Sequence, residues 1–290
     1  MSQARVAVVG SYGVGLTFGV ERVPERGETV IGDVFRADAG GKGSNQAIGA
    51  ARLGARASLL TAIGEDDFGD GALRLWAEEG VEADGVVRVP LPTMVGAILV
   101  EASGDNRIAI VPGALSALAA EHVDRFRETI ATADVLLVQL EIPVEPAWRA
   151  LELARAAGVR TVLNPAPAPR EPLPSEMLAL ADFVTPNETE AARLGSAIEA
   201  AGTIVLTLGA AGVRVGDERV SGFPAEPVDT TGAGDAFNAA FAVALAEGRS
   251  ALEAARWGCA AGALSVERAG VVPGLPRRHE LERRLEPAVA

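Results

Sequence analysis

Asp235 ends a loop of small residues and begins a long apolar run, residues 236–245. Gly232, Ala233 and Gly234 come directly before it, and residues this small let successive backbone N–H groups point at one place. A helix that begins near Asp235 adds its positive end there, so the stretch can bind an anion. A carboxylate beside a bound anion is useful when it takes a proton from a hydroxyl that attacks phosphorus. The alternative interpretation makes Asp235 a helix cap with no chemistry.

A glycine loop around Lys42 is the second stretch whose residue types suit chemistry. Lys42 is the only lysine of the chain, and the glycines beside it let a ligand approach the backbone closely. The loop is not a phosphate-binding P-loop, because Arg36 occupies the position of that motif's first glycine. Lys42 and Asn45 offer hydrogen bonds suited to hydroxyls, with Gly41 next to them. The alternative is a loop that only starts a helix.

Further polar groups follow predicted strands. Glu141 comes where a carboxylate points into the cleft of an open α/β sheet and can accept bonds from two hydroxyls. Asn187 and Glu190 suit phosphate oxygens and a hydrated magnesium ion. Each has a plain alternative, since Glu141 can be a solvated strand end and the other two a helix capping box. The last group lies at a glycine turn that either contacts a nucleotide or closes a hairpin: Thr207, Gly209 and Gly212.

The composition narrows the class of protein. The chain has 290 residues, of which 49% are apolar, so one large core or two smaller ones can form. A net charge of −13 argues against a nucleic-acid partner or an anionic membrane surface. Cys259 is the only cysteine, which excludes an internal disulfide. We find no secretory pattern and no apolar stretch of membrane length, so we expect a cytoplasmic protein.

From about residue 116 the chain alternates helices with short strands, which predicts βαβ units and a parallel sheet. The expected elements are a helix over 116–131 capped by Ser116, a strand over 135–140 and a helix over 145–157. Strands over 160–163 and 183–184, a helix over 188–201 and a strand over 203–207 follow. Two strand-rich insertions, the first with strand over 28–38, fall outside this pattern and suit a small sheet placed over the strand ends. We therefore expect an α/β core of residues 1–11, 38–92 and 108–290 and a β lid of residues 12–37 and 93–107.

Four stretches of this chain, taken together, resemble the PfkB family of carbohydrate kinases, and its ribokinase branch in particular. Residues 40–47, Gly-Gly-Lys-Gly-Ser-Asn-Gln-Ala, are similar to one family signature. Residues 229–237, Asp-Thr-Thr-Gly-Ala-Gly-Asp-Ala-Phe, are similar to the other, more specific one. Residues 164–168 and 185–190 resemble ribokinases. The resemblance extends over nearly the whole chain.

The resemblance implies a Rossmann-like α/β fold, with a mostly parallel sheet, helices on both of its faces and a small β-sheet lid. It implies transfer of the γ-phosphoryl group of ATP to a sugar hydroxyl, with Asp235 as the base and residues 232–234 as the anion hole. It also implies Mg²⁺ near the phosphates and a monovalent cation, K⁺, beside the anion hole.

The same resemblance assigns residues to each ligand. The sugar would be held by Gly41, Lys42, Asn45, Glu141 and Asp235. The nucleotide would be contacted by Asn187, Thr207, Gly209, Gly212, Gly234 and Cys259. The metal sites would use Glu190 for magnesium and Asp229, Thr231, Ser265 and Gly270 for potassium.

Two departures from the ribokinase pattern put the substrate in question. Ribokinases similar to this chain carry Gly-Ser-x-Asn-x-Asp after the first strand, and the Asp binds sugar hydroxyls. Gly13 and Gly15 replace both polar residues here, so a ribose loses hydrogen bonds unless Tyr12 compensates. A different sugar, a polyol or a nucleoside ring stacked on Tyr12 also fits. The segment 190–207 is shorter than usual, which affects nucleotide preference.

These features favour an ATP-dependent kinase of ribose or a similar small sugar. One alternative is a kinase of nucleosides or of other modified sugars and polyols. Another is a non-catalytic sugar- or nucleotide-binding protein on the same fold, against which the intact Asp235 and Glu190 argue. The expected partners are the sugar and ATP, with no nucleic acid and no membrane. The exposed edges of a lid sheet also favour a homodimer formed through the lid.

Overall fold

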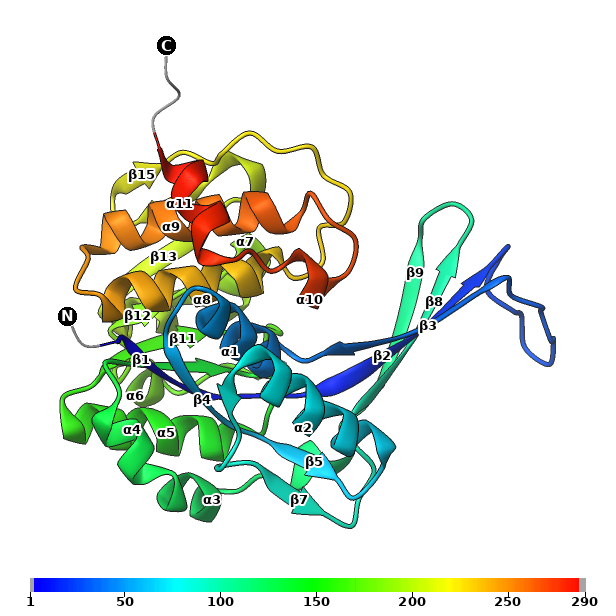
Figure 1. Ribbon diagram of the computed structural model, residues 1–290, viewed down its shortest axis with the longest axis horizontal. Helices are drawn as coiled ribbons and strands as arrows, with labels where there is room; N and C mark the ends of the chain where they lie inside the picture. Colours follow the sequence, from blue (N-terminus) through cyan, green and yellow to red (C-terminus); the bar gives the residue numbers. More distant parts are fainter. Residues whose placement is uncertain (1–2, 170, 287–290) are drawn as a thin grey trace.

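The computed structural model describes residues 3–169 and 171–286, and its centre is a nine-stranded sheet (Figure 1). The strand order is β15-β14-β13-β12-β11-β10-β1-β4-β6. The neighbours from β13 to β6 pair in parallel, and β14 and β15 add an antiparallel edge, so the predicted mostly parallel sheet is confirmed. The strands are β1 Arg5–Val9, β4 Arg56–Leu60, β6 Val81–Glu82, β10 Val135–Gln139, β11 Arg160–Asn164, β12 Phe183–Val184, β13 Thr203–Thr207, β14 Val213–Val215 and β15 Glu218–Val220.

Helices cover both faces of this sheet, as the alternation of elements predicted (Figure 1). One face carries α1 Lys42–Arg52, α2 Asp67–Glu79, α8 Ala233–Ala246, α9 Ala251–Ser265 and α11 Arg278–Leu285. The other carries α3 Ala120–Arg125, α4 Arg127–Thr132, α5 Val144–Ala157, α6 Ser175–Leu178 and α7 Glu188–Leu194. Shorter elements are α10 Val271–Gly274 and the 3₁₀ helices η1 Gly113–Ala117, η2 Gly195–Ala200 and η3 Gly209–Ala211.

A second sheet of four strands, in the order β3-β2-β8-β9, extends away from the main body (Figure 1). Its strands are β2 Gly13–Val20, β3 Val34–Gly40, β8 Val95–Glu101 and β9 Asn106–Val111. We call it the lid. It includes residues 38–40 and 108–111, which the sequence-based bounds give to the core, so the division of the chain into domains stays a prediction. Two short strands, β5 Ala62–Gly64 and β7 Val87–Val89, pair separately in the body.

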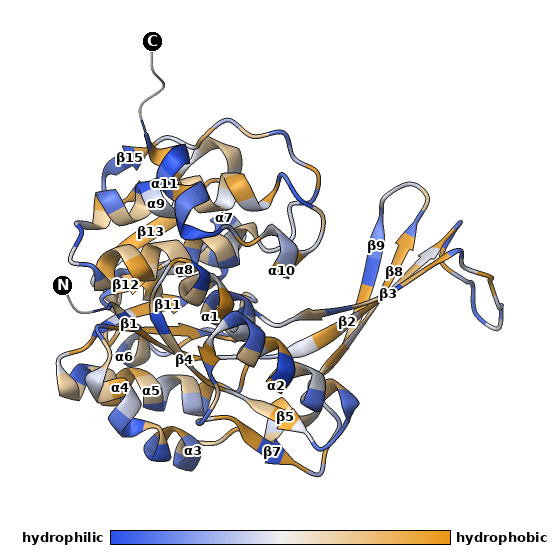
Figure 2. Ribbon diagram, viewed as in Figure 1, coloured by the Kyte–Doolittle hydropathy of each residue, from blue (hydrophilic) through white to orange (hydrophobic). Residues whose placement is uncertain are grey.

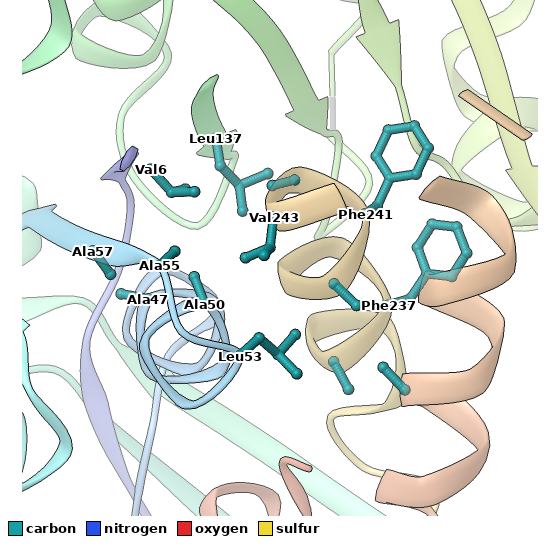
Figure 3. Packing of buried hydrophobic residues seen from close by; sticks show 14 of the residues in the cluster. Val6, Ala47, Ala50, Leu53, Ala55, Ala57, Leu137, Phe237, Phe241 and Val243 are labelled. Carbon is teal, nitrogen blue, oxygen red and sulfur yellow. The ribbon is translucent and has the colours of Figure 1, made fainter. Parts of the chain in front are cut away.

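The hydrophobic core lies on both faces of the central sheet, and its densest part surrounds α8. Every residue of α8 from Asp235 to Leu245 is buried, which explains the continuous apolar run there. Figure 3 shows α1 on one side of α8 and the rings of Phe237 and Phe241 on its other side. Gly258 of α9 makes room for Phe237, because a Cβ atom at Gly258 would come within 2.5 Å of that ring. Figure 2 shows the same contrast between an apolar interior and polar outer helix faces.

Three predicted elements differ from the structure. The helix expected over 116–131 is η1 followed by α3 and α4, because the backbone is extended at Ala119 and leaves helical geometry at Phe126. Ser116 lies inside η1 and its hydroxyl donates to Gly113, so it caps no helix. The helix expected over 188–201 ends at Leu194, where Gly195 takes a positive φ of 56°. The strand expected over 28–38 begins only at Val34.

We expect Trp76→Ala to lower the free energy of unfolding by about 3–5 kcal/mol, the usual cost of emptying a large buried aromatic site. Trp76 is fully buried, its ring packs edge-on against Tyr12 at 5.1 Å, and its Nε1 donates to the Ser44 hydroxyl at 2.8 Å. Urea denaturation of both proteins measures the difference. Ile31→Ala is the control, because Ile31 is 94% exposed and its loss costs less than about 0.5 kcal/mol. Equal stability losses in the two variants would contradict this account of the core.

Candidate active site

The candidate site lies where two helices begin beside the carboxyl end of the central sheet. α1 and α8 pack against each other, and both start at this edge, next to the ends of β1 and β10. Ligands of open α/β sheets bind at such an edge. The two loops that the sequence singled out, around Lys42 and before Asp235, are therefore neighbours although about 190 residues separate Asn45 from Asp235.

Close backbone packing explains the glycines of the Lys42 loop. Gly41 has a φ of 90°, and a Cβ atom there would lie 2.6 Å from the Cα of Tyr12. A Cβ atom at Gly43 would lie 2.5 Å from the backbone nitrogen of Ser11. The backbone N–H of Ser44 donates to the Ser11 carbonyl at 2.8 Å. The start of α1 is thus pressed onto the segment that follows β1.

Asp235 is held by two amide side chains of α1. Asn45 Nδ2 donates to one carboxylate oxygen at 2.8 Å, and Gln46 Nε2 donates to the other at 2.9 Å. The side chain is 6% exposed. Burial raises the pKa of Asp235, and the positive charge of Lys42 and both amide hydrogen bonds oppose that rise without cancelling it. The result is an oriented carboxylate whose proton affinity exceeds that of a free aspartate.

Lys42 lies among three carboxylates. Burial lowers the pKa of its ammonium group, but the charges of Asp235, Glu141 and Glu190 outweigh burial and raise it overall. Glu141 follows β10, and one of its oxygens accepts hydrogen bonds from the Ser11 hydroxyl and from the backbone N–H of Lys42, the latter at 3.0 Å. The structure therefore brings the predicted sugar residues Lys42, Asn45, Glu141 and Asp235 together.

A buried polar network beneath Asp235 was missed by sequence reasoning. Gln46 also donates to Asn164 Oδ1 at 3.2 Å, and its own oxygen accepts from Gln139 Nε2 at 2.6 Å. The Thr185 hydroxyl donates to Asn238, whose amide donates to the Gly234 carbonyl at 2.8 Å; Asn164 donates to the Thr185 carbonyl at 3.1 Å. The helical spacing offered a signal, because Gln46 follows Lys42 by four residues and therefore shares its helix face.

Two amide oxygens of the site and its network accept no hydrogen bond from the described residues, Oδ1 of Asn45 and Oε1 of Gln139. Asn45 is 4% exposed, and its Oδ1 accepts no hydrogen bond although its Nδ2 is fixed on Asp235. A buried acceptor without a donor costs free energy, so this oxygen is suited to a ligand hydroxyl.

The small-residue loop before Asp235 has the geometry of a helix N-terminus. Gly232 caps α8 with a φ of 83°, and a Cβ atom there would lie 2.5 Å from Val271. A Cβ atom at Gly234 would have no atom within 4 Å, so this face of the helix start is open. The first N–H groups of an α-helix lack intrahelical partners and bind anions.

The residues predicted to face the nucleotide phosphates form a local unit. Asn187 caps α7, because its side-chain oxygen accepts from the Glu190 backbone N–H at 2.8 Å. The Glu190 carboxylate in turn accepts from the Asn187 backbone N–H at 2.9 Å. Glu190 is 8% exposed, and burial raises its pKa. Thr207 pairs with Asn187 and donates to the Pro186 carbonyl at 3.2 Å. The capping interpretation of Asn187 and Glu190 is thus correct as geometry.

The glycine turn after β13 brings together the remaining turn residues. Gly209 opens η3, and Gly212 ends it with a φ of 95°. A Cβ atom at Gly212 would lie 2.1 Å from the Val220 carbonyl, so the hairpin of β14 and β15 requires a glycine there. Both interpretations of this turn fit the structure, because the turn joins the antiparallel strands β13 and β14 and follows Thr207, which pairs with Asn187.

Backbone contacts of Asp229 connect the residues predicted to bind the monovalent cation. Asp229 accepts from the backbone N–H of Thr231 at 2.9 Å and of Gly270 at 3.0 Å. Burial opposes ionisation, but these bonds and the charge of Arg36 hold the pKa of Asp229 below its usual value. Ser265 is 3% exposed, directly precedes Val266, and the Val266 carbonyl accepts from Asp229 N–H at 3.1 Å.

Cys259 and Tyr12 are both buried in the structure. Cys259 is 9% exposed within the core cluster of α8 and α9, where burial raises its thiol pKa to about 11. Its assignment to the nucleotide stays a prediction. Tyr12 is 2% exposed and packs against Trp76, so it cannot stack on a nucleoside ring or compensate for lost sugar contacts. Side chains alternate along an extended chain, so Tyr12 points away from the face that carries Gly13 and Gly15 and packs on Trp76 instead.

Within residues 3–169 and 171–286, no three His, Cys, Asp or Glu side chains gather as a candidate metal cluster. A helix of the length and apolarity needed to cross a membrane is also absent from this described part of the chain.

Comparison with known proteins identifies relatives over the full length of the chain. Residues 3–278 match the family model of pfkB family carbohydrate kinases. A ribokinase of Bacillus subtilis is 39% identical over 288 residues, covering 96% of this chain and 98% of that protein. A deoxyribokinase of Salmonella typhi is 34% identical, covering 82% of this chain and 84% of that protein.

A solved structure agrees with the sequence match. The ribokinase of Arabidopsis thaliana complexed with ribose and ATP superposes with a TM-score of 0.92 at 32% identity, covering 99% of this chain and all of that chain. The family model, the relatives and the fold agree with one another. The chain therefore belongs to the pfkB family of carbohydrate kinases.

Proposed function

We propose that the protein transfers the γ-phosphoryl group of ATP to a hydroxyl of ribose or a similar small sugar, with Asp235 as the catalytic base. The observation that supports this role most directly is the position of Asp235. Its carboxylate sits in the first turn of α8, beside the open face of Gly234, and Asn45 and Gln46 fix both of its oxygens. The anion loop and the sugar residues thus meet at one carboxylate.

In the proposed reaction, the sugar hydroxyl gives its proton to Asp235 while its oxygen forms a bond to the γ-phosphorus. The bond from that phosphorus to the bridging oxygen breaks, and ADP leaves with the electron pair. Backbone N–H groups of residues 232–234 stabilise the negative charge on the transferred group because the open helix start points at it. The raised pKa of Asp235 makes the carboxylate a better proton acceptor than a free aspartate.

The sugar is held opposite this loop. The unpartnered Oδ1 of Asn45 accepts one hydroxyl, and the second oxygen of Glu141 accepts another. Lys42, kept charged by its three acidic neighbours, donates to sugar oxygens and balances the charge of Asp235. These contacts orient the attacking hydroxyl without taking part in proton transfer.

Magnesium and potassium have suitable donors here. Glu190 keeps one carboxylate oxygen outside its capping bond, and Mg²⁺ commonly binds through one carboxylate and several waters. Asp229 is ionised, and backbone carbonyls near Ser265 and Gly270 suit an alkali cation. The chemistry that bound magnesium supplies is neutralisation of charge on the phosphate oxygens. Thr207, Gly209 and Gly212 would line the nucleotide, with Asn187 at its phosphates.

The lid supports a proposed homodimer. Phe18 and Phe35 lie opposite each other on the lid face that points away from Gly15, with ring centroids 5.3 Å apart and exposures of 38% and 63%. Exposed apolar groups of this size on a flat sheet favour pairing with a second copy. A cytoplasmic location is part of the same proposal and rests on the sequence alone.

We expect Asp235→Asn to reduce kcat by at least about a hundredfold, because the amide cannot accept the hydroxyl proton. Nucleotide affinity, measured by calorimetry, should stay near that of the unchanged protein. In the unchanged protein, kcat/KM should fall on the acidic side as Asp235 protonates, at a pH above 3.8 because its pKa is raised. A coupled assay across the pH range measures both. Near-normal kcat in the variant would refute the assignment of Asp235.

We expect Phe35→Glu to shift the protein towards the monomer, because the new charge must be desolvated in the paired lids. Sedimentation velocity gives the mass of each form. Ile31→Glu places the same charge on an exposed position of the loop between β2 and β3 and serves as the matched control. A monomeric unchanged protein would disprove the dimer, whatever the variants do.

We expect Asp229→Ala to abolish stimulation by potassium and to lower the free energy of unfolding by about 1–3 kcal/mol, because the N–H groups of Thr231 and Gly270 lose their acceptor. Initial rates in potassium chloride and in choline chloride measure the first effect, and urea denaturation measures the second. Equal potassium stimulation in both proteins would contradict a cation site at Asp229.

A further inference from the structure

The lid strands β2 and β3 join the body beside the proposed sugar residues, and Gly13 and Gly15 share one face of β2. β2 begins two residues after Ser11, whose hydroxyl binds Glu141. Arg36 of β3 lies on the same face, since side chains alternate along strands and Arg36 pairs with Thr17. The opposite face carries Val14, Leu16 and Ala39, which pack on the core that contains Tyr12. The face with Gly13 and Gly15 is therefore turned away from that core.

Both glycines are covered by apolar side chains. A Cβ atom at Gly13 would lie 2.4 Å from the Cε methyl of Met94, and Met94 is 7% exposed. A Cβ atom at Gly15 would lie 3.3 Å from the Cδ1 methyl of Ile98. Methyl groups therefore fill the space that side chains at these two positions would take. We call these four residues the lid wall.

The neighbouring positions on this face are mixed. Thr17, the next residue on the same face of β2, is polar and 8% exposed, whereas Ile110 of β9 is apolar. Ile110 lies over Gly96, where a Cβ atom would be 3.8 Å from its Cγ1. Asp38, opposite Gly15, is the charged side chain on this face beside the wall, and its carboxylate lies 3.6 Å from Arg36 with 59% of the side chain exposed. The Asp38 carboxylate therefore pairs with the Arg36 guanidinium in an exposed ion pair.

Hydrogen-bonding groups lie on the other side of the site. Lys42, Asn45, Glu141 and Asp235 come from α1, α8 and the end of β10. A sugar hydroxyl turned to the lid wall would lose its water partners and meet methyl groups and glycine backbone. An unpaired hydroxyl in such a place is penalised strongly, whereas a C–H group is not.

We propose that the lid wall selects a pentose that lacks one ring hydroxyl, so that a deoxypentose is used in preference to ribose. This inference rests on the proposed kinase function and names the acceptor of that same site. A nucleoside is disfavoured, because Met94 and Ile98 fill the space at both glycines and Tyr12 is buried. One relative named as a deoxyribokinase is consistent with such an acceptor in the family.

The test compares initial rates of ADP formation from D-ribose, 2-deoxy-D-ribose and 3-deoxy-D-ribose at saturating ATP and magnesium. One deoxypentose should exceed ribose in kcat/KM by about tenfold or more, the effect of one unpaired hydroxyl. Ribose used equally well or better than both deoxypentoses overturns the proposal while leaving the kinase function intact. No turnover of any of the three sugars counts against the kinase function itself.

Variants test whether the wall sets this preference. The double change Gly13→Asn with Met94→Gly removes the Cε and Cβ atoms of Met94 and supplies an amide, while the Met94 carbonyl stays 2.9 Å from the new Cβ, so folding is checked first. The folded variant should raise the ribose to deoxypentose ratio by about tenfold. Ile31→Asn puts the same amide on an exposed lid position and should leave the ratio unchanged. Asp38→Asn should also leave it unchanged; a selective loss of ribose turnover in that variant would mean that Asp38 binds sugar, which overturns the apolar wall. An unchanged ribose to deoxypentose ratio in a folded double variant also overturns the proposal that the lid wall sets this preference.

Discussion

The contact on which the site depends is the pair of amide hydrogen bonds from Asn45 and Gln46 to Asp235. A buried carboxylate is costly unless donors satisfy it, and these two donors come from a helix 190 and 189 residues away in the sequence. The same contact ties α1 to α8, two helices that also share the densest part of the core. Fold stability and the orientation of the reactive carboxylate therefore rest on the same interface. Burial leaves the pKa of Asp235 raised, so the interface also tunes its proton affinity.

The network below Asp235 gives this arrangement rigidity. Gln46 is oriented by Gln139 and Asn164, and Asn238 links the start of α8 to Thr185 at the end of β12. Every member is largely buried and bonded to the next, so rotation of one side chain breaks a bond elsewhere. The sheet ends, rather than flexible loops, thereby fix the carboxylate and the anion loop relative to each other.

Much of this site could be predicted from local sequence. Glycines before Asp235 and around Lys42 have local steric causes, and Glu141 follows from the rule that parallel strands end at one edge. The alternation of strands and helices is also a local pattern, and it predicts the mostly parallel sheet. Gln46 could not be assigned, because its role depends on Asp235, 189 positions away. The inward turn of Tyr12 depends likewise on Trp76, and the break of the expected 116–131 helix depends on how α3 and α4 each pack on α5.

The lid joins the body beside Lys42 and Glu141, two of the residues proposed to hold the sugar. β2 leaves two residues after Ser11, which binds Glu141, and β3 ends at Gly40, two residues before Lys42. Gly41 and Gly43 pack these two strand ends against each other with no room for a side chain. A displacement of the lid therefore moves the backbone that positions Lys42 and Glu141. The two lid faces differ in character. One carries Gly13 and Gly15 with the methyl groups of Met94 and Ile98 beside them. The other packs Val14 on the core and exposes Phe18 and Phe35 further out.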